Sequence, residues 1–185
     1  MFQIAPPILP GCLLLRASTL MRGEGWSSPV YSERQMGEIG IHDRFIDDCI
    51  HYADKAGTVR GLRYQLAPAS QALLLRVLRG RIYFAAVDVR RSSETFGKSF
   101  EGAISYMGAE QLYAMPGFAV GWCSLEPAVE VLVKASAAPD ADLERGINWR
   151  DPALAIQWPV RPAEAILTPQ DIDQPMLADQ PDLLD

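Results

Sequence analysis

Polar side chains gather in one short, otherwise apolar stretch, residues 58–65, which reads TVRGLRYQ. Arg60, Arg63, Tyr64 and Gln65 all lie in it. Apolar residues between polar ones over eight positions are typical of a β-strand that carries polar groups into a site. A guanidinium keeps its proton at any physiological pH, so Arg63 can bind or stabilise an anion but cannot serve as a base.

Histidine is the side chain whose ordinary pKa lies near neutrality, and the chain has 2 of them. His42 is expected at the exit of a helix, whereas His51 lies in a β-rich stretch ahead of residues 58–65. His51 could therefore act as a base, and a purely structural role is the alternative. Two histidines are too few for a metal site built of several imidazoles and a carboxylate, so no metal is expected.

Composition points to a single globular domain that binds a small molecule. Of the 185 residues, 49% are hydrophobic and 22% charged, and the net charge of -6 argues against binding to nucleic-acid phosphates. No apolar run approaches the ~20 residues that a membrane helix needs, and the first residues make a poor signal peptide. The three cysteines are scattered and show no zinc-binding pattern. We therefore expect a reduced, cytoplasmic protein without nucleic-acid or membrane partners.

Frequent glycines and prolines divide the chain into short segments, as in many-stranded β folds. Strands are predicted, with CLLLRAS (12–18) as the first, at 44–52, 58–66, 72–78, 82–89, 99–106, 119–125 and 129–135. Gly80 marks a hairpin or a sharp corner, and Ser32 can cap a short helix over 32–41. This pattern predicts a sandwich or barrel whose interior can hold a ligand. Residues 1–177 are expected to form one domain with an irregular C-terminal part, and 178–185 a flexible acidic tail.

Six stretches carry a resemblance to a known family: VRGLRYQ, RVLRGRIYFAAVDVRRSSETFGK, QLYAMPGFAVGW, ERGINWRDPALAIQWP, YSERQMGEIGI and LTPQDIDQP. Over roughly residues 10–178 the sequence resembles the dTDP-4-dehydrorhamnose 3,5-epimerases. The resemblance implies an all-β, cupin-type double-stranded β-helix (a jelly roll), usually a homodimer, that needs no metal; we expect no cofactor. Members of the family epimerise C3 and C5 of a 4-keto sugar nucleotide in deoxysugar biosynthesis.

The resemblance also implies that the usual catalytic set is missing. Removing a proton α to a carbonyl needs a base, an enolate stabiliser and an acid. The family's base is a histidine in a motif like RGLHYQ, and Arg63 stands in its place. The family's lysine, acid tyrosine and second histidine fall at Leu73, Val133 and Val120. Since each acid–base group is typically worth ~10²–10⁴ in rate, ordinary 3,5-epimerisation is not expected.

Other family positions are kept or shifted. Asp171 matches the aspartate that orients the base, and Arg60 matches an arginine that faces phosphate. A second phosphate-binding arginine falls near Glu24, whose charge would repel a diphosphate. His51 falls near a further family histidine. A tyrosine pair that would help to hold the base and the sugar is replaced by SAAPD, residues 136–140.

From these positions we predict the site. The catalytic set is Arg63, His51 and Asp171; the substrate-binding set is Arg60, Tyr64, Gln65, Tyr113 and Trp122. Arg63 and Asp171 are expected to pair, either as a buried ion pair that fills the pocket or as a cation offered to a ligand.

Three functions stay open at this point. The first is an altered isomerisation or cyclisation on a small carbonyl-containing substrate, such as a nucleotide sugar. The second is a non-catalytic pseudo-epimerase that binds or scaffolds. The third is a 3,5-epimerase with rewired residues. The first is slightly preferred, because the changed positions carry other specific residues while the framework and Asp171 are kept.

Overall fold

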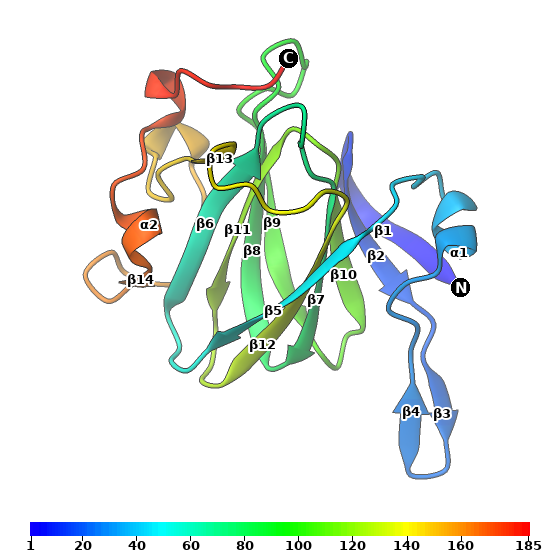
Figure 1. The fold of residues 1–185 in the computed structure, drawn as a ribbon. Helices are drawn as coiled ribbons and strands as arrows, with labels where there is room; N and C mark the ends of the chain where they lie inside the picture. Colours follow the sequence, from blue (N-terminus) through cyan, green and yellow to red (C-terminus); the bar gives the residue numbers. More distant parts are fainter.

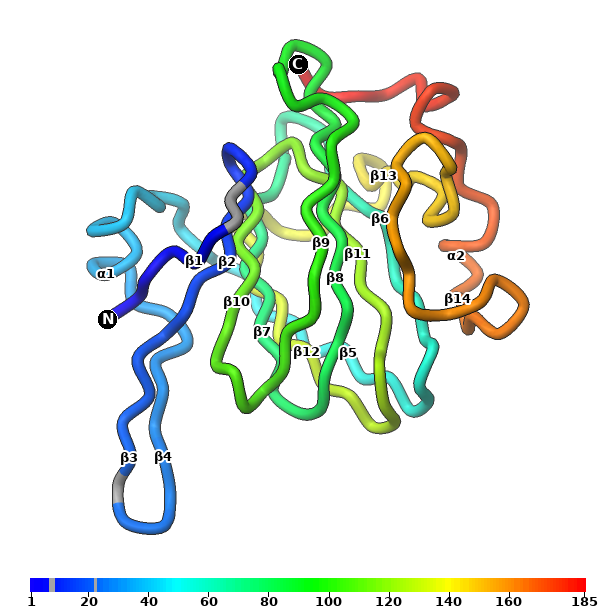
Figure 2. The backbone as a smooth tube through the Cα atoms, turned by 180° about the vertical axis from the view of Figure 1, so that it is seen from behind, coloured from blue at the N-terminus to red at the C-terminus, as the bar shows by residue number. Residues whose placement is uncertain are grey.

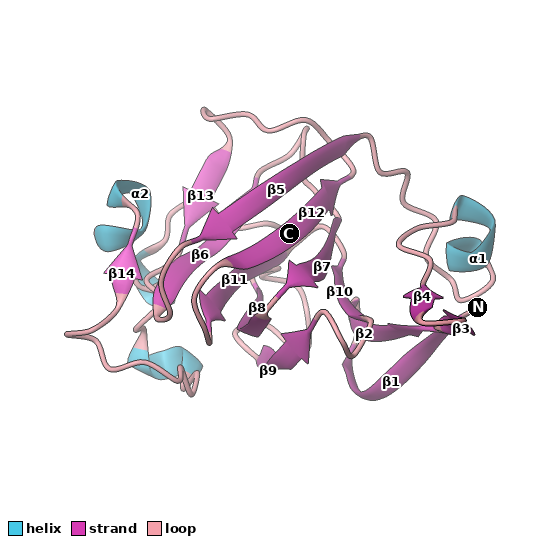
Figure 3. Ribbon diagram, turned by 90° about the horizontal axis from the view of Figure 1, so that it is seen from below, coloured by secondary structure: helices cyan, strands magenta, loops and turns pink.

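Two antiparallel sheets face each other in the computed structural model, which describes residues 1–6, 9–21 and 23–185 (Figure 1, Figure 3). The first sheet runs in the order β1 (Phe2–Leu9), β2 (Cys12–Ala17), β10 (Glu110–Ala114), β7 (Leu73–Arg79), β12 (Val129–Ala135) and β5 (Asp47–Ala53). The second runs β13 (Glu144–Gly146), β6 (Thr58–Gln65), β11 (Phe118–Ser124), β8 (Arg81–Asp88) and β9 (Ser99–Ser105). β14 (Ile166–Leu167) pairs with β6 in parallel.

Smaller elements surround these sheets. A hairpin of β3 (Leu20–Arg22) and β4 (Gly25–Ser27) projects away from the body (Figure 1, Figure 2). α1 (Glu33–Gly37) begins at Ser32, whose hydroxyl accepts the N–H of Gln35 at 3.4 Å. The C-terminal part holds α2 (Pro169–Ile172) and the 3-10 turns Pro152–Leu154 and Leu177–Asp179. Among the residues described, no helix is long and apolar enough to cross a membrane.

Apolar side chains of both sheets meet in one core. Phe84 of β8 and Phe100 of β9 stack edge to face with centroids 5.4 Å apart, close to Val131 of the opposite sheet. The α1 region covers the outer face of the first sheet, where Met36 packs against Leu74. The C-terminal part covers the second sheet. The core therefore occupies the space between the sheets except where a cavity remains.

Gly80 marks the point where the chain leaves one sheet for the other. It has a φ of +81° and separates β7 of the first sheet from β8 of the second. A Cβ at this position would lie 2.8 Å from Val129, so a side chain would fit poorly. The sequence predicted either a hairpin or a sharp corner at Gly80, and the structure shows a corner between the two sheets.

The predicted all-β class and the N-terminal helix are confirmed. Seven of the predicted strands are also confirmed: β5, β6, β7, β8, β9, β11 and β12. CLLLRAS was wrongly predicted to be the first strand, because β1 precedes it and pairs with it. β10 and the β3–β4 hairpin were not predicted. α1 is shorter than the predicted 32–41, ending at Gly37.

The stretch 178–185, predicted to be a flexible tail, contacts the body in the structure. The Gln180 side chain donates to the carbonyl of Gly146 at 2.8 Å, and the N–H of Arg91 donates to the carbonyl of Leu184 at 2.7 Å. The carboxylate of Asp182 pairs with Arg145 at 2.7 Å. Flexibility of this stretch in solution stays a prediction.

Candidate active site

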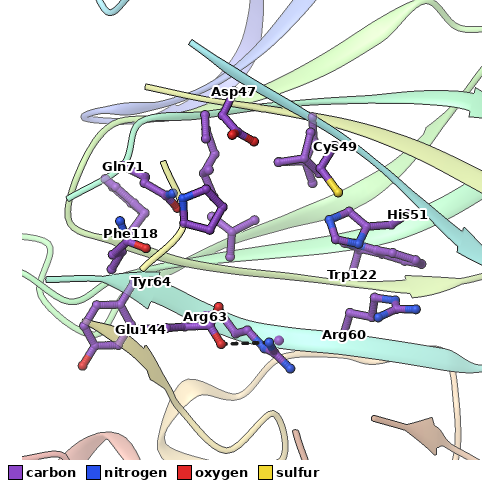
Figure 4. Close-up of a pocket in the computed structure, with 18 residues that line it drawn as sticks. Asp47, Cys49, His51, Arg60, Arg63, Tyr64, Gln71, Phe118, Trp122 and Glu144 are labelled. Carbon is purple, nitrogen blue, oxygen red and sulfur yellow. Dashed lines mark hydrogen bonds and ion pairs between the residues drawn. The ribbon is translucent and has the colours of Figure 1, made fainter. Parts of the chain in front are cut away.

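A cavity of about 280 Å³ opens between β5, β7 and β12 of the first sheet and β6 and β11 of the second (Figure 4). Most of its polar lining comes from two facing strands. β5 contributes Asp47, Cys49 and His51, and β6 contributes Arg60, Arg63, Tyr64 and Gln65. Apolar side chains fill the rest of the lining: Leu73, Leu75, Phe118, Val120, Trp122, Val133 and Ala135.

Strand alternation brings the β5 residues together. Successive side chains of a strand point to opposite faces, so residues 47, 49 and 51 share the cavity side. Ile50 and Tyr52, between and beyond them, are 60% and 50% exposed on the outer face. The β5 side chains Asp47, Cys49 and His51 are called the β5 wall below.

Arg63 is held by protein groups on every nitrogen of its guanidinium. Its Nε donates to Asp171 Oδ1 at 2.9 Å, and its Nη2 lies 2.8 Å from the same oxygen. Nη1 donates to Glu144 Oε1 at 2.9 Å and to Gln170 Oε1 at 2.8 Å. Nη2 also donates to Thr168 at 3.2 Å. The predicted Arg63–Asp171 pair is therefore present, and the guanidinium is a fixed charge rather than a free ligand-binding group.

Asp171 lies behind Arg63 rather than in the cavity. Its side chain is fully buried and also accepts the N–H of Gly61 at 3.2 Å and the hydroxyl of Thr168 at 2.5 Å. Gly61 has a φ of +91°, and a Cβ there would lie 2.5 Å from the carbonyl oxygen of Val120. Only glycine allows β6 to run this close to β11. The carboxylate is thus built to neutralise Arg63.

Arg60 has fewer partners. Its Nη2 donates to the carbonyl of Tyr52 at a long 3.4 Å, and its buried Nε has no partner among the described residues. The guanidinium lies over the Trp122 ring, 5.9 Å from the centroid. A guanidinium without a carboxylate partner beside an aromatic ring is suited to an anionic group on a ligand.

His51 is half-buried at the same end of the cavity, and its ring makes no hydrogen bond with the described residues. Burial, and then the charges of Arg60 and Arg63, lower its pKa from the usual 6.5. The ring is therefore neutral at physiological pH and can accept a proton.

Tyr64 and Gln65 line the cavity while their polar atoms are engaged elsewhere. The Tyr64 hydroxyl donates to the carbonyl of Asp182, and burial followed by the Asp182 charge raises its pKa above the ordinary value. The Gln65 amide donates to Ala69 and Ala138 carbonyls at 2.6 and 3.0 Å. Both residues shape the wall and fix the adjoining loops.

One predicted substrate-binding residue lies elsewhere. Tyr113 is on the outer face of the first sheet, where its hydroxyl donates to Asp43 at 2.5 Å, and it does not line the cavity. On β10 the alternation sends Leu112, not Tyr113, into the core. Glu24 lies in the turn of the projecting β3–β4 hairpin (Figure 2).

The positions where the family has its catalytic residues lie together in the structure. Leu73, Val120 and Val133 line the same cavity as Arg63, and none of the three can exchange a proton. The groups free to do so lie on the β5 wall.

Asp47, Cys49 and Glu144 were not predicted. The first two could have been found from His51, because residues two and four positions earlier in a strand share its face. Glu144 belongs to a short strand that the sequence pattern did not reveal. Within residues 1–6, 9–21 and 23–185 no three His, Cys, Asp or Glu side chains are arranged to hold a metal ion.

Two facing antiparallel sheets around a ligand-sized cavity define a jelly-roll protein of the cupin class. A family model described as dTDP-4-dehydrorhamnose 3,5-epimerase matches residues 7–179. The chain is 34% identical over 161 residues to the epimerase of that name from Sinorhizobium fredii, covering 85% of this chain and 80% of the relative. It is 32% identical to the enzyme of the same name from Shigella flexneri, covering 89% and 90%. The chain belongs to the dTDP-4-dehydrorhamnose 3,5-epimerase family.

Solved structures agree with this assignment. The epimerase from Bacillus anthracis, with TDP and PPi bound, superimposes with a TM-score of 0.91 at 31% identity, covering 95% of this chain and 99% of that one. The epimerase from Legionella pneumophila, in complex with dTDP-4-keto-L-rhamnose, gives 0.90 at 27% identity, covering 96% and 94%. The predicted jelly roll is confirmed.

Proposed function

We propose that this protein binds a dTDP-linked keto sugar and isomerises it by moving a proton along one face of the sugar ring. One observation carries the proposal: among the described residues that line the cavity, the one imidazole is on the β5 wall, and Arg63, Leu73, Val120 and Val133 cannot exchange protons. Epimerisation inverts a carbon, so a proton must leave one face and another must arrive on the opposite face. A cavity with proton-transfer groups on one wall suits a reaction in which the proton leaves and returns on the same face of the ring.

The reaction class that fits is a keto shift between neighbouring carbons. His51 removes the proton from C3, α to a C4 carbonyl, and the electrons pass into an enediolate. The same imidazole returns the proton to C4 on the same face, while the hydroxyl proton passes from O3 to O4. The carbonyl then stands at C3, and no proton is lost or gained overall.

Fixed positive charge assists this step. The enediolate is anionic, and preorganised cations stabilise such charge without reorganising. Arg60 has no carboxylate partner among the described residues and supplies this charge over Trp122, to the diphosphate and to the enediolate beside it. The charge of Arg63 is offset by Asp171 and Glu144, so Arg63 serves to hold the wall of the cavity in place. The dTDP-bound relatives support this choice of ligand.

A non-catalytic sugar-nucleotide-binding protein is the second candidate. It is favoured by the Arg63 ion-pair group, which fills the base position with a fully partnered side chain. Both candidates share the ligand and differ in turnover.

Turnover on dTDP-4-keto-6-deoxyglucose, followed by proton NMR at high substrate concentration, separates them. We expect the 3-keto isomer from the wild type and from His42→Gln, a control at the exposed histidine. His51→Gln should lower the rate at least ~100-fold. Binding without turnover would support the binding protein, and an L-configured product would show 3,5-epimerisation.

A further inference from the structure

We infer that Asp47 selects the sugar by its C6 substituent: it favours a hydrogen-bond donor, a hydroxyl or an ammonium group, over the methyl group of a 6-deoxy sugar. The inference rests on the proposed function, because it assumes a nucleotide sugar in the cavity. Asp47 would be a specificity determinant that touches the substrate and takes no part in the proton transfer.

Two neighbouring aspartates on β5 have opposite environments. Asp48 points outward and pairs with Lys134 at 2.6 Å. Asp47 points into the cavity (Figure 4), and no group in the described part of the chain bonds its carboxylate. Leu73 and Ala135 are among its fellow lining residues. A carboxylate without a partner inside a cavity is available to accept a hydrogen bond from a donor on a ligand.

The charges around the cavity also favour a ligand that brings a donor to Asp47. Two carboxylates, Asp47 and Glu144, line the cavity with two guanidiniums, Arg60 and Arg63, and the charge of Arg63 is already offset by Asp171 behind it. A bound diphosphate adds further negative charge. A ligand that brings a proton donor to Asp47, and above all a cation, offsets that imbalance.

The spacing of residues along β5 indicates which part of the sugar meets Asp47. Asp47 lies four positions before His51, which corresponds to about 13 Å along a strand. With the diphosphate at Arg60, beside His51, Asp47 faces the end of the sugar remote from C1. The hydroxyl at C3 lies with C3 at His51, and a carbonyl at C4 has no proton to donate, so the group left to meet Asp47 is the substituent on C5, which is C6.

Three non-reacting ligands that differ only at C6 test the inference: dTDP-quinovose (methyl), dTDP-glucose (hydroxyl) and dTDP-6-amino-6-deoxyglucose (ammonium). Dissociation constants would be measured by isothermal titration calorimetry. For the wild type we expect the ammonium ligand to bind about tenfold tighter than the methyl ligand, with the hydroxyl ligand between them. Asp47→Asn should reduce the ammonium-to-methyl ratio to below about threefold.

Asp48→Asn is the matched control, since it removes the neighbouring carboxylate on the outer face and should keep the wild-type ratio. Binding of dTDP alone shows that each variant is folded with its nucleotide site intact. Equal affinity of the wild type for all three ligands would overturn this inference and leave the proposed isomerisation standing. If no ligand binds, including dTDP, both proposals fall.

Discussion

At the scale of single residues, the side chain that decides the chemistry is Arg63. Its planar guanidinium reaches two carboxylates, an amide and a hydroxyl at once, a geometry that a lysine could not reproduce. The pair that it forms with Asp171 was predictable from the sequence. Its saturation by Glu144, Gln170 and Thr168 was not, because those groups come from segments without a readable pattern.

Removing that charge should destabilise the fold. Arg63→Met leaves the fully buried Asp171 carboxylate without its cation and should lower the free energy of unfolding by about 3 kcal/mol, measured by urea denaturation. Arg16→Met removes an exposed pair with Glu110, 3.3 Å apart, and should cost less than ~1 kcal/mol. Similar losses in the two variants would mean that the Arg63 group is not a structural ion pair.

The state of His51 gives a second prediction. Its pKa should lie below 6.5, and Arg60→Gln should raise it by removing one of the two charges that lower it. Proton NMR titration of the ring signals measures both values, and His42→Gln identifies which signal belongs to His51. The acid limb of kcat/KM should then lie below pH 6.5 and shift upward in Arg60→Gln. A pKa above 6.5 would contradict the described surroundings of the ring.

At the scale of elements, the end of β8 is fixed by the buried carboxylate of Asp88. Burial alone would raise the pKa of Asp88, but hydrogen bonds from Arg90, Ser93 and Thr95 bring it from 3.8 to about 2. Arg90 Nη2 lies 2.6 Å from the carboxylate, and its guanidinium lies 5.0 Å from the centroid of Phe118. This group therefore ties the turn after β8 to β11.

The contribution of Asp88 to the stability of the fold should decrease at low pH. A carboxyl whose pKa is lower in the folded state stabilises the fold above its unfolded pKa of ~4 and loses that effect as pH falls through about 2. Asp88→Asn should cost about 2 kcal/mol at pH 7, measured by urea denaturation, and the difference from wild type should narrow between pH 4 and 2. A difference that stays constant over this range would assign the cost to packing alone.

A strand could be predicted from the sequence where its pattern of apolar and polar residues is strong. β6, β8 and β12 have long β-rich runs, and their bounds were nearly right. β1 was missed because the sequence there contains two consecutive prolines, which weaken a strand signal. The β3–β4 hairpin was missed because glycines and charges dominate its sequence. Register within β10 decides which face Tyr113 takes, and register is set by pairing with β2 and β7.

At the scale of the whole molecule, we expect a homodimer. The β3–β4 hairpin projects from the body (Figure 1), and a two-stranded hairpin is only marginally stable in water. Its Leu20 and Met21 are 56% and 74% exposed. A second copy of the chain would cover this apolar surface.

Light scattering after size-exclusion chromatography should give twice the 20.4 kDa chain mass. Met21→Asp should shift the mass toward the monomer, because it places a charge in the contact. Ile172→Asp, on exposed α2 away from the hairpin, should leave the mass unchanged. A wild-type monomer would exclude the expected homodimer.

The cavity as a whole was only partly predictable. The β6 residues and His51 were found because polar side chains on apolar strands are conspicuous. The β5 wall became visible when the facing sheets placed residues 47, 49 and 51 opposite Arg60 and Arg63. Its position is a property of the packing between two sheets, which no single segment encodes.

Transfer on one face by His51 is tested by the position of deuterium after turnover of dTDP-4-keto-6-deoxyglucose in D₂O, read by NMR against an enzyme-free sample. The proton that His51 takes from C3 exchanges with D₂O while the imidazolium holds it, so transfer on one face predicts deuterium at C3 of recovered substrate and at C4 of the 3-keto product. C5 should keep its proton, and the sugar should therefore keep its D configuration. Deuterium at C5 together with an L-configured sugar would rule out proton transfer on one face by His51.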